Sequence, residues 1–293
     1  MELFDTHCHM HELVRRLTPV YDKWREDGVE RTADGVIAAA NEAAVKYMLC
    51  VGTSLADSEL AVEFVKDREN VWATIGIHPH EAQHHIQTAQ TDRPAKPPAS
   101  SAPRAALGSV RGDVRERMNE LAKNKKVVAV GECGLDYFYT HSPKEAQVEL
   151  LKFQIELALE HDLPLSFHVR EAFDDFWPIF DSYGGKIRGV LHSFTDSEAN
   201  LAKAVERGLY IGVNGIATFA KQPEKAVTYR TIPQRLLLLE TDAPFLTPVP
   251  YRGKVCESKH VRVTAEFLSK LRDEDLARLG AATTQNARTL FKV

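Results

Sequence analysis

The sequence predicts an α/β protein folded as a single-domain (β/α)8, or TIM, barrel, and three observations favour this class. Its 293 residues, 44% of them hydrophobic, suffice for one large barrel core. Eight short apolar runs recur along the chain, and most are near-continuous stretches of valine, isoleucine and leucine, which is typical of strands covered on both faces. Helix-like segments separate these runs, and repeated alternation of strand and helix is the pattern of such a barrel.

The eight predicted strands are short. Runs of this length do not separate a strand from a buried helix by themselves, so the prediction depends on their repetition. The strands are expected at residues 2–5, 47–52, 71–77, 127–132, 163–168, 188–192, 209–213 and 236–240.

The clearest predicted helix runs from residue 142 to about residue 161. Ser142 is expected as its N-cap, Pro143 at the first helical position, and Glu145 as the partner that completes a capping box. A second helix is expected to begin near residue 195 or 196 and to end at Gly208, because glycine suits the position just past a helix.

One segment, residues 87 to about 113, does not follow the alternation of strand and helix. It is rich in alanine, proline and serine and has almost no large apolar side chains. This composition predicts a flexible surface insertion between the third strand and the next helix. A tolerated loop is the favoured interpretation, and a docking site for a partner is the alternative.

Composition and charge exclude several classes of protein. The net charge is −4, from 37 basic and 41 acidic residues, so a globally basic coat for nucleic acid is absent and phosphate binding must depend on local charge or metal. The four cysteines are widely spaced without a CxxC pair, which suits a reducing compartment. Neither a signal peptide nor an 18-residue apolar run is evident, so we expect a soluble, cytoplasmic protein.

Good metal ligands follow five of the predicted strands. In a barrel of parallel strands the carboxyl ends converge on one mouth, so these residues are expected to share a pocket. Four imidazoles and two carboxylates in one pocket are typical of a two-metal hydrolytic site. The candidate ligands are His7, His9, Glu132, His168, His192 and Asp242.

Each candidate also has a structural interpretation when it is taken singly. His7 and His9 project to one face of an extended segment, but a lone HxH pair is more often two polar residues at a strand end. Asp242 suits an N-cap equally well. Glu132 ends a buried run, so its carboxylate must be paired, hydrogen-bonded or bound to metal. The coincidence of all six favours the metal site.

The mixed nitrogen and oxygen donors suit Zn²⁺, Mn²⁺ or, with several waters, Mg²⁺. Two such ions activate water and stabilise charge on the attacking and leaving oxygens of a phosphoester. Asp242 and Glu132 are the predicted catalytic carboxylates, Asp242 as the ligand that takes a proton from the attacking water.

Several segments together resemble the TatD family of metal-dependent hydrolases, from the first strand to NARTLF at residues 286–291. They are FDTHCH, GIHPH, VGECGLDY, LPLSFHVREA, GVLHSFT, IGVNG, LLLETDAPFLTP and YRGK. The resemblance implies an amidohydrolase-like TIM barrel, two divalent metal ions and phosphodiester hydrolysis, in the family typically as a deoxyribonuclease.

The resemblance also implies how the ligands divide. His7, His9, Glu132 and Asp242 would hold one ion, and Glu132, His168 and His192 the other, with Glu132 as the bridge. The chain departs from the family pattern after YRGK, where residues 255–258 read VCES in place of the usual Asn-Glu-Pro, and Asp196 stands where glycine is commoner. These departures put substrate preference and loop shape in doubt.

Four further positions are predicted to contact substrate. His78 lies in GIHPH at the end of the third strand and is expected either to contact substrate or to support the metal shell. Arg170 can pair with phosphate through its planar guanidinium, although a rim salt bridge is as good an interpretation. Arg252 and Lys254 begin a basic stretch after the eighth strand, which is either a phosphate contact or a solvated loop. The aromatic residues 137–139 either stack on a base or wall the pocket.

The predicted function is a metal-dependent phosphodiesterase that trims single-stranded DNA from its 3′ end, with RNA as the alternative substrate and a monomer as the expected state. One alternative is an amidohydrolase that acts on a small C–N or ester substrate. Many such barrels bridge their metals with a carboxylated lysine on strand four, where this chain has Glu132. A second alternative is a non-catalytic scaffold, against which the intact ligand set argues.

Overall fold

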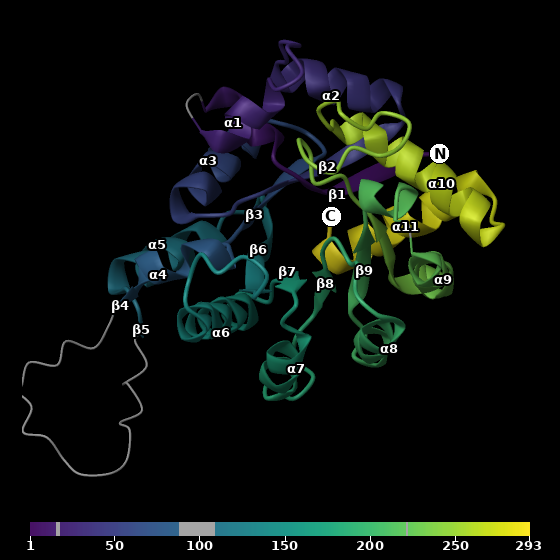
Figure 1. Cartoon of the computed structure of the whole chain (residues 1–293). Helices are drawn as coiled ribbons and strands as arrows, with labels where there is room; N and C mark the ends of the chain where they lie inside the picture. Colours follow the sequence, from purple (N-terminus) through teal and green to yellow (C-terminus); the bar gives the residue numbers. More distant parts are fainter. Residues whose placement is uncertain (16–17, 88–108, 221) are drawn as a thin grey trace, which may run out of the picture.

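The fold is a closed sheet of eight parallel strands surrounded by helices (Figure 1). The computed structural model describes residues 1–15, 18–87, 109–220 and 222–293. Neighbouring strands follow the order of the chain, which confirms the predicted (β/α)8 barrel. The strands are β1 (Leu3–Cys8), β2 (Val45–Val51), β3 (Val71–Ile75), β6 (Val127–Asp136), β7 (Leu165–Arg170), β8 (Gly189–Leu191), β9 (Tyr210–Val213) and β10 (Leu237–Leu239).

The segment that follows β10 closes the barrel against β1. Cys8 and Ala243 form a parallel bridge, and the amide of His9 donates to the carbonyl of Ala243. The amide of Asp242 donates to the carbonyl of His7 over 2.8 Å. The closure therefore holds the first and last candidate ligands side by side.

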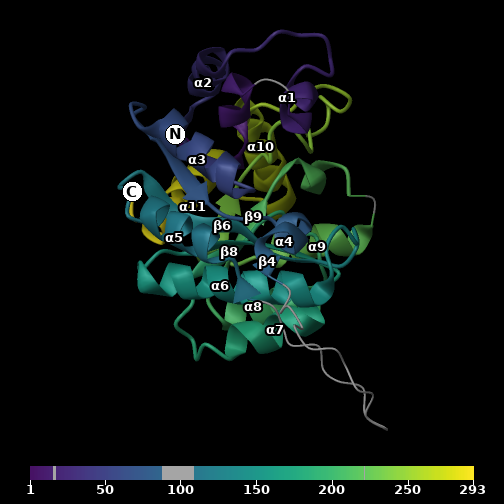
Figure 2. The ribbon, with the colours of Figure 1, turned by 90° about the vertical axis from the view of Figure 1, so that its left-hand side faces the viewer.

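Helices cover the outside of the barrel, with α6, α7 and α8 on one side and α1 and α2 on the opposite side (Figures 1 and 2). The longer ones are α2 (Ala33–Glu42), α3 (Leu55–Val65), α5 (Gly112–Ala122), α6 (Lys144–Glu160), α7 (Phe173–Asp181), α8 (Glu198–Glu206), α9 (Pro223–Thr231), α10 (Val261–Arg272) and α11 (Leu276–Phe291). Shorter pieces include α1 (Pro19–Trp24), α4 (Ala82–His85), η1 (Met10–Val14), η2 (Pro79–Glu81), η3 (Gly215–Thr218), η4 (Gln234–Leu236) and η5 (Ser258–His260).

An apolar cluster inside the barrel is completed by helix α11. Phe4, Leu49 and Leu238 of the strands share this cluster with Leu290 and Phe291 of α11. The Phe4 and Phe291 rings lie 6.3 Å apart. Helix α11 thus covers the strands near their amino ends and leaves the carboxyl ends free to form a mouth.

Strand β6 is longer than the predicted run and continues four residues past Glu132. It does so because its later part pairs with β7, Gly134 opposite His168 and Asp136 opposite Arg170. Gly134 has a φ of +151°, and a Cβ there would collide with the carbonyl oxygen of His168. The prediction that Glu132 ends its strand was wrong, since this close approach carries the pairing further.

The predicted helix 142–161 is confirmed as α6, but its predicted N-terminus was wrong. Pro143 is the N-cap and has no side-chain hydrogen bond, so the capping box is absent. The Ser142 hydroxyl instead donates to the carbonyl of His80 and accepts from the amide of Gln83. Ser142 therefore fixes the segment after β3 rather than helix α6.

The second predicted helix is α8. Its N-cap is Ser197, whose hydroxyl accepts from the amide of Asn200, so the helix begins slightly later than expected. Gly208, with a φ of +70°, follows its C-cap as predicted.

The predicted flexible loop lies largely at residues 88–108, outside the described residues. Its two flanks form an antiparallel pair, β4 (Ile86–Gln87) with β5 (Ser109–Val110), and α5 begins at Gly112. The segment thus falls between strand β3 and helix α5 as predicted, but its described ends include paired strands.

Candidate metal centre

The six candidate ligands meet at the carboxyl ends of the strands. On one side, His7 Nε2 lies 3.4 Å from Glu132 Oε2 and 3.8 Å from Asp242 Oδ1. His9 Nε2 lies 3.3 Å from the same Asp242 oxygen. The Nδ1 atom of His9 is 2.9 Å from the carbonyl of Val51, which leaves Nε2 directed at the mouth.

The other side is built around the second oxygen of Glu132. Its Oε1 lies 2.9 Å from His168 Nδ1 and 3.8 Å from His192 Nε2. His78 Nε2 is 3.6 Å from the same oxygen. Burial opposes ionisation of Glu132, but the surrounding histidines, His78 first, hold its pKa well below the usual range. Glu132 is therefore a buried carboxylate with a different group of histidines at each oxygen.

Asp242 is held in place by its backbone. Its φ is +64°, a left-handed conformation that aspartate tolerates better than most residues. Its amide donates to His7 and its carbonyl accepts from the amide of Phe245. Burial raises the pKa of Asp242, but His9 and its neighbours lower it further, so the carboxylate is ionised.

His7 shows that these residues fit a metal ion. Its side chain is fully buried, and neither ring nitrogen has a hydrogen-bond partner among the described residues. The ring stacks on His192 with 3.5 Å between centroids. Burial and the neighbouring His192 lower the pKa of His7, so the imidazole is neutral, the form that binds metal. A buried, unpartnered nitrogen beside carboxylates is what an ion would satisfy.

Two buried carboxylates that were not predicted from the sequence lie beside the ring nitrogens of these histidines. Asp136 Oδ2 lies 3.0 Å from His168 Nε2 and 3.1 Å from His80 Nε2. Glu240 Oε1 lies 3.0 Å from His192 Nδ1. Carboxylates of this kind fix the tautomer and the direction of a metal-binding imidazole.

A signal for both carboxylates was present in the sequence. Alternate residues of a strand point to the same side, and Asp136 lies four residues after Glu132 within β6. Glu240 lies two residues before Asp242. Each is thus spaced an even number of residues from a candidate ligand.

The oriented histidines are basic. Burial lowers the pKa of His168, but Asp136 and Glu132 outweigh it and raise the pKa to about 8. In the same way burial lowers the pKa of His192, and Glu240 raises it to about 10. Both imidazoles are therefore good donors once a cation displaces the proton.

The predicted substrate residues divide between the mouth and its surroundings. His78 and Arg170 line a cavity of about 660 Å³ together with five of the six candidate ligands, all except the fully buried His7. The Arg170 guanidinium lies 3.9 Å from the Phe138 ring centroid and 4.7 Å from that of Tyr139. Arg252 and Lys254 are exposed in the loop after β10 and do not line this cavity.

The three aromatic residues after Glu132 have different surroundings. Tyr137 donates its hydroxyl to Asp175, so it braces the loop. Phe138 and Tyr139 are 48% and 44% exposed, and Tyr139 lines the cavity. Two of the three thus have free surface beside the mouth.

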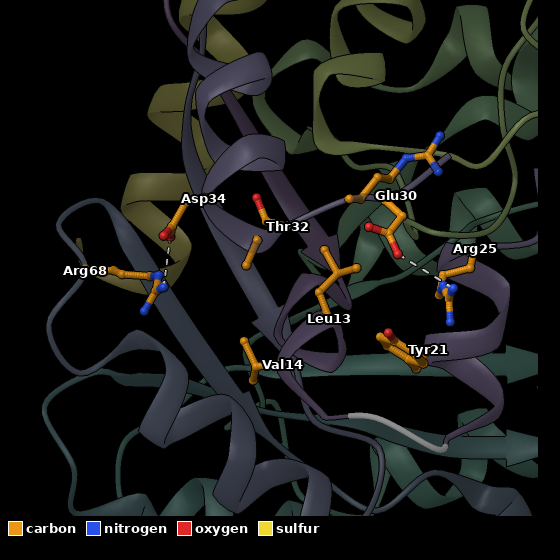
Figure 3. A pocket seen from close by; sticks show the side chains of 10 residues that line it. Leu13, Val14, Tyr21, Arg25, Glu30, Thr32, Asp34 and Arg68 are labelled. Atoms are coloured by element: carbon orange, nitrogen blue, oxygen red, sulfur yellow. Dashed lines mark hydrogen bonds and ion pairs between the residues drawn. The ribbon is translucent and has the colours of Figure 1, made fainter. Parts of the chain in front are cut away.

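A further hollow, of about 330 Å³, lies between η1, α1 and the start of α2 (Figure 3). Its charges neutralise one another, with Arg68 3.0 Å from Asp34 and Arg25 3.8 Å from Glu30. Its described lining contains no histidine. The mouth of the barrel is therefore the stronger candidate for chemistry.

The chain is similar to members of one protein family. Residues 4–292 match the family model described as TatD related DNase. The chain is 33% identical over 294 residues to YabD of Bacillus subtilis, an uncharacterized metal-dependent hydrolase, covering 99% of both chains. It is 33% identical over 266 residues to the 3′-5′ ssDNA/RNA exonuclease TatD of Salmonella typhimurium, covering 89% of this chain and 93% of that one.

Solved structures show the same fold. YjjV, a TatD homolog from Escherichia coli K12, superposes with a TM-score of 0.79 at 24% identity, over 99% of this chain and 98% of that one. Within the described ranges, the helices are all too short or too polar to cross a membrane. The chain therefore belongs to the TatD family and is a metal-dependent hydrolase.

Proposed function

We propose that this hydrolase cleaves the phosphodiester bonds of single-stranded DNA from the 3′ end, with two divalent ions in the mouth of the barrel. The observation that carries the proposal is the position of Glu132. Its Oε2 faces His7 at 3.4 Å, and its Oε1 faces His168 at 2.9 Å. A carboxylate between two groups of histidines is suited to bridge two cations.

The donors divide into two sets around this bridge. His7, His9 and Asp242 would hold one ion. His168 and His192, which both face Glu132 Oε1, would hold the other. Mg²⁺, Mn²⁺ and Zn²⁺ each accept imidazole or carboxylate donors of this kind. When bound, such ions lower the pKa of water and neutralise charge on a phosphoryl group.

The protein's own groups supply the proton chemistry. Asp242 is ionised, and its side chain is 17% exposed, so it can take a proton from water in the mouth. Asp136 and Glu240 keep His168 and His192 directed inward. The catalytic roles thus fall on Asp242 and Glu132.

The rim of the mouth supports a single-stranded substrate. Arg170 can pair with a backbone phosphate while it stays stacked on the aromatic rings. Phe138 and Tyr139 offer exposed faces on which unpaired bases stack without sequence preference. The name of the Salmonella relative supports the 3′-to-5′ direction and makes RNA the second candidate substrate.

The amidohydrolase alternative is weaker. Among the described residues no lysine lines the cavity, and the bridging position on β6 is Glu132. A scaffold function is weaker still, because the chain belongs to a family of hydrolases and keeps the complete donor set.

The test uses single-stranded DNA labelled at either end, incubated with Mg²⁺, Mn²⁺, Zn²⁺ or EDTA. We expect the wild type to release mononucleotides from the 3′ end with metal, and Glu132→Gln to be inactive. Glu145→Gln, an exposed glutamate of α6, is the matched control and should behave as the wild type. The proposal fails if no metal supports cleavage, or if Glu132→Gln is as active as the control.

A further inference from the structure

A second hollow, of about 310 Å³, opens beside the mouth. It lies among η3, the start of α9 and the loop between β8 and α8. Thr195 and Ile216 line both this hollow and the mouth, so the two spaces share a wall. Thr195 is three residues from His192 in the same loop. Whatever occupies the hollow therefore lies next to the candidate metal ligands.

The lining of the hollow suits a flat heteroaromatic group. Ile216, Phe219 and the buried Tyr229 give it an apolar interior. Gln222 is exposed at its edge, and its amide can both donate and accept. An apolar space of this size with a few polar groups at its edge is typical of a small-molecule site.

The positive charge at the hollow is fixed in place. Lys225 Nζ donates to the carbonyls of Thr195 and Asp196, which holds the ammonium beside the shared wall. An ammonium has three donors, so one remains for a ligand. The Arg252 guanidinium lies 3.8 Å from the Phe219 ring centroid and brings a second positive charge to this ring. A base in the hollow would therefore lie close to two cationic side chains and next to the wall shared with the mouth.

The geometry points to a base-binding subsite: the hollow receives the base of the 3′-terminal nucleotide, whose phosphate lies at the metal ligands. This assignment rests on the proposed nuclease function and adds the part of the substrate that each region contacts. The hollow has room for one base, whereas the exposed Phe138 and Tyr139 face solvent, where the rest of a strand can continue. Arg252, which does not line the mouth, gains a role here as a neighbour of the terminal nucleotide.

The test compares two single-stranded oligonucleotides that differ only at the 3′ end, where one carries a normal nucleotide and the other an abasic one. For the wild type we expect kcat/KM to be about tenfold higher on the normal end, as one stacked base is worth about that much. Phe219→Ala should remove this preference by raising KM on the normal end while leaving the abasic substrate unchanged. Gln222→Ala, at an exposed position, should alter the relative rates among the four terminal bases without affecting the fold.

The matched control is Val227→Ala, an exposed apolar residue of α9 that does not line the hollow, and it should leave both substrates unchanged. The subsite is overturned if the wild type cleaves both ends equally, or if Phe219→Ala slows both substrates by the same factor. Those results leave the nuclease function standing. If the wild type cleaves neither substrate with any metal, the nuclease function and the subsite both fall.

Discussion

Two buried clusters of histidine and carboxylate in this barrel contain the same residue types but differ in how their polar atoms are satisfied. One is the metal centre proposed at the mouth. The other, the inner cluster, consists of His11, Glu12 and Asp57. The donor atoms of each cluster lie close enough together to surround an ion, so proximity alone does not distinguish them.

The carboxylates of the inner cluster already have protein donors. Asp57 Oδ1 lies 2.9 Å from His11 Nε2, and its Oδ2 accepts from both the amide and the hydroxyl of Thr53. Glu12 accepts from the Thr18 hydroxyl over 2.6 Å. His11 Nδ1 has no hydrogen-bond partner in the described structure, but both oxygens of Asp57 and one oxygen of Glu12 have donors. This cluster is a structural network.

The mouth also contains paired carboxylates, with Glu132 Oε1 2.9 Å from His168 Nδ1, but it differs from the inner cluster at His7. Both ring nitrogens of His7 are without a partner in the described residues, and the Glu132 carboxylate borders a cavity of about 660 Å³. Burial lowers the pKa of His11, but Asp57 outweighs it and raises the pKa to about 10, whereas the pKa of His7 is lowered. The difference between the clusters therefore lies at His7, a neutral buried imidazole with no hydrogen-bond partner in the described residues, whereas His11 is held in an ion pair with Asp57.

The largest expected effect is on activity, at the mouth. Asp242→Asn should reduce kcat on single-stranded DNA by about 10³-fold, because the amide cannot accept the proton and ligates metal poorly. Far-ultraviolet circular dichroism should show an unchanged fold. Asp273→Asn is the control, since Asp273 is an exposed aspartate that also has a left-handed φ, of +53°. Equal activity of the two variants would contradict the role of Asp242.

A substitution in the inner cluster should lower the stability of the fold. Asp57→Asn should lower the free energy of unfolding by about 3–5 kcal/mol near pH 6, because it leaves His11 charged, buried and without its partner. The raised pKa of His11 contributes stability below about pH 6.5 that is lost as the pH rises toward 10. Urea unfolding in EDTA should therefore show that Asp57→Asn lowers the free energy of unfolding, relative to the wild type, by less at pH 9.5 than at pH 6.

Asp34→Asn is the control for this stability change. It removes an exposed partner of Arg68, so its effect should stay below about 1 kcal/mol. The structural assignment of the inner cluster is wrong if, at pH 6, Asp57→Asn lowers the free energy of unfolding by no more than Asp34→Asn does. It is also wrong if Asp57→Asn abolishes activity while the protein stays folded.

The rise in Tm on adding metal should distinguish variants of the metal centre from variants of the inner cluster. At a free Mn²⁺ concentration of about 100 times Kd, each bound ion stabilises the fold by about 2.7 kcal/mol, so Tm should rise relative to EDTA. Glu132→Gln should remove most of this rise, while Asp57→Asn should keep it from a lower starting Tm. Scanning calorimetry with and without Mn²⁺ measures both; loss of the rise in Asp57→Asn would mean that the inner cluster binds the ion.

A smaller effect is expected from the orienting carboxylates. Asp136→Asn and Glu240→Gln should each weaken metal binding by about 10- to 100-fold without removing a ligand. Isothermal titration with Mn²⁺ checks this, with Asp175→Asn as a control at an exposed aspartate that contacts Tyr137. Unchanged affinity in both variants would limit Asp136 and Glu240 to packing.

The barrel and the meeting of the ligands could be predicted because both follow from local patterns. Apolar runs fix the strands, and parallel strands bring their carboxyl ends together, so Glu132 and Asp242 had to meet the histidines. The pairing of Asp136 with His168 and of Glu240 with His192 could not be predicted from such local patterns. Their partners His168 and His192 lie on other strands, and which donor a buried carboxylate chooses depends on the register between strands.

The errors have the same physical origin. Ser142 has the sequence signature of an N-cap, but contacts with His80 and Gln83, about 60 positions earlier in the chain, take its hydroxyl. The extension of β6 depends on the fit of Gly134 against His168. The inner cluster was not predicted either, since the Asp57 that pairs with His11 lies 46 residues along the chain.

The most direct test of the central claim is the location of the ions themselves. Crystals grown with Mn²⁺ would be measured for anomalous scattering. We expect two anomalous peaks in the mouth, one on each side of the Glu132 carboxylate, and none between His11 and Asp57. A single peak, or a peak at the inner cluster with the mouth empty, would contradict it.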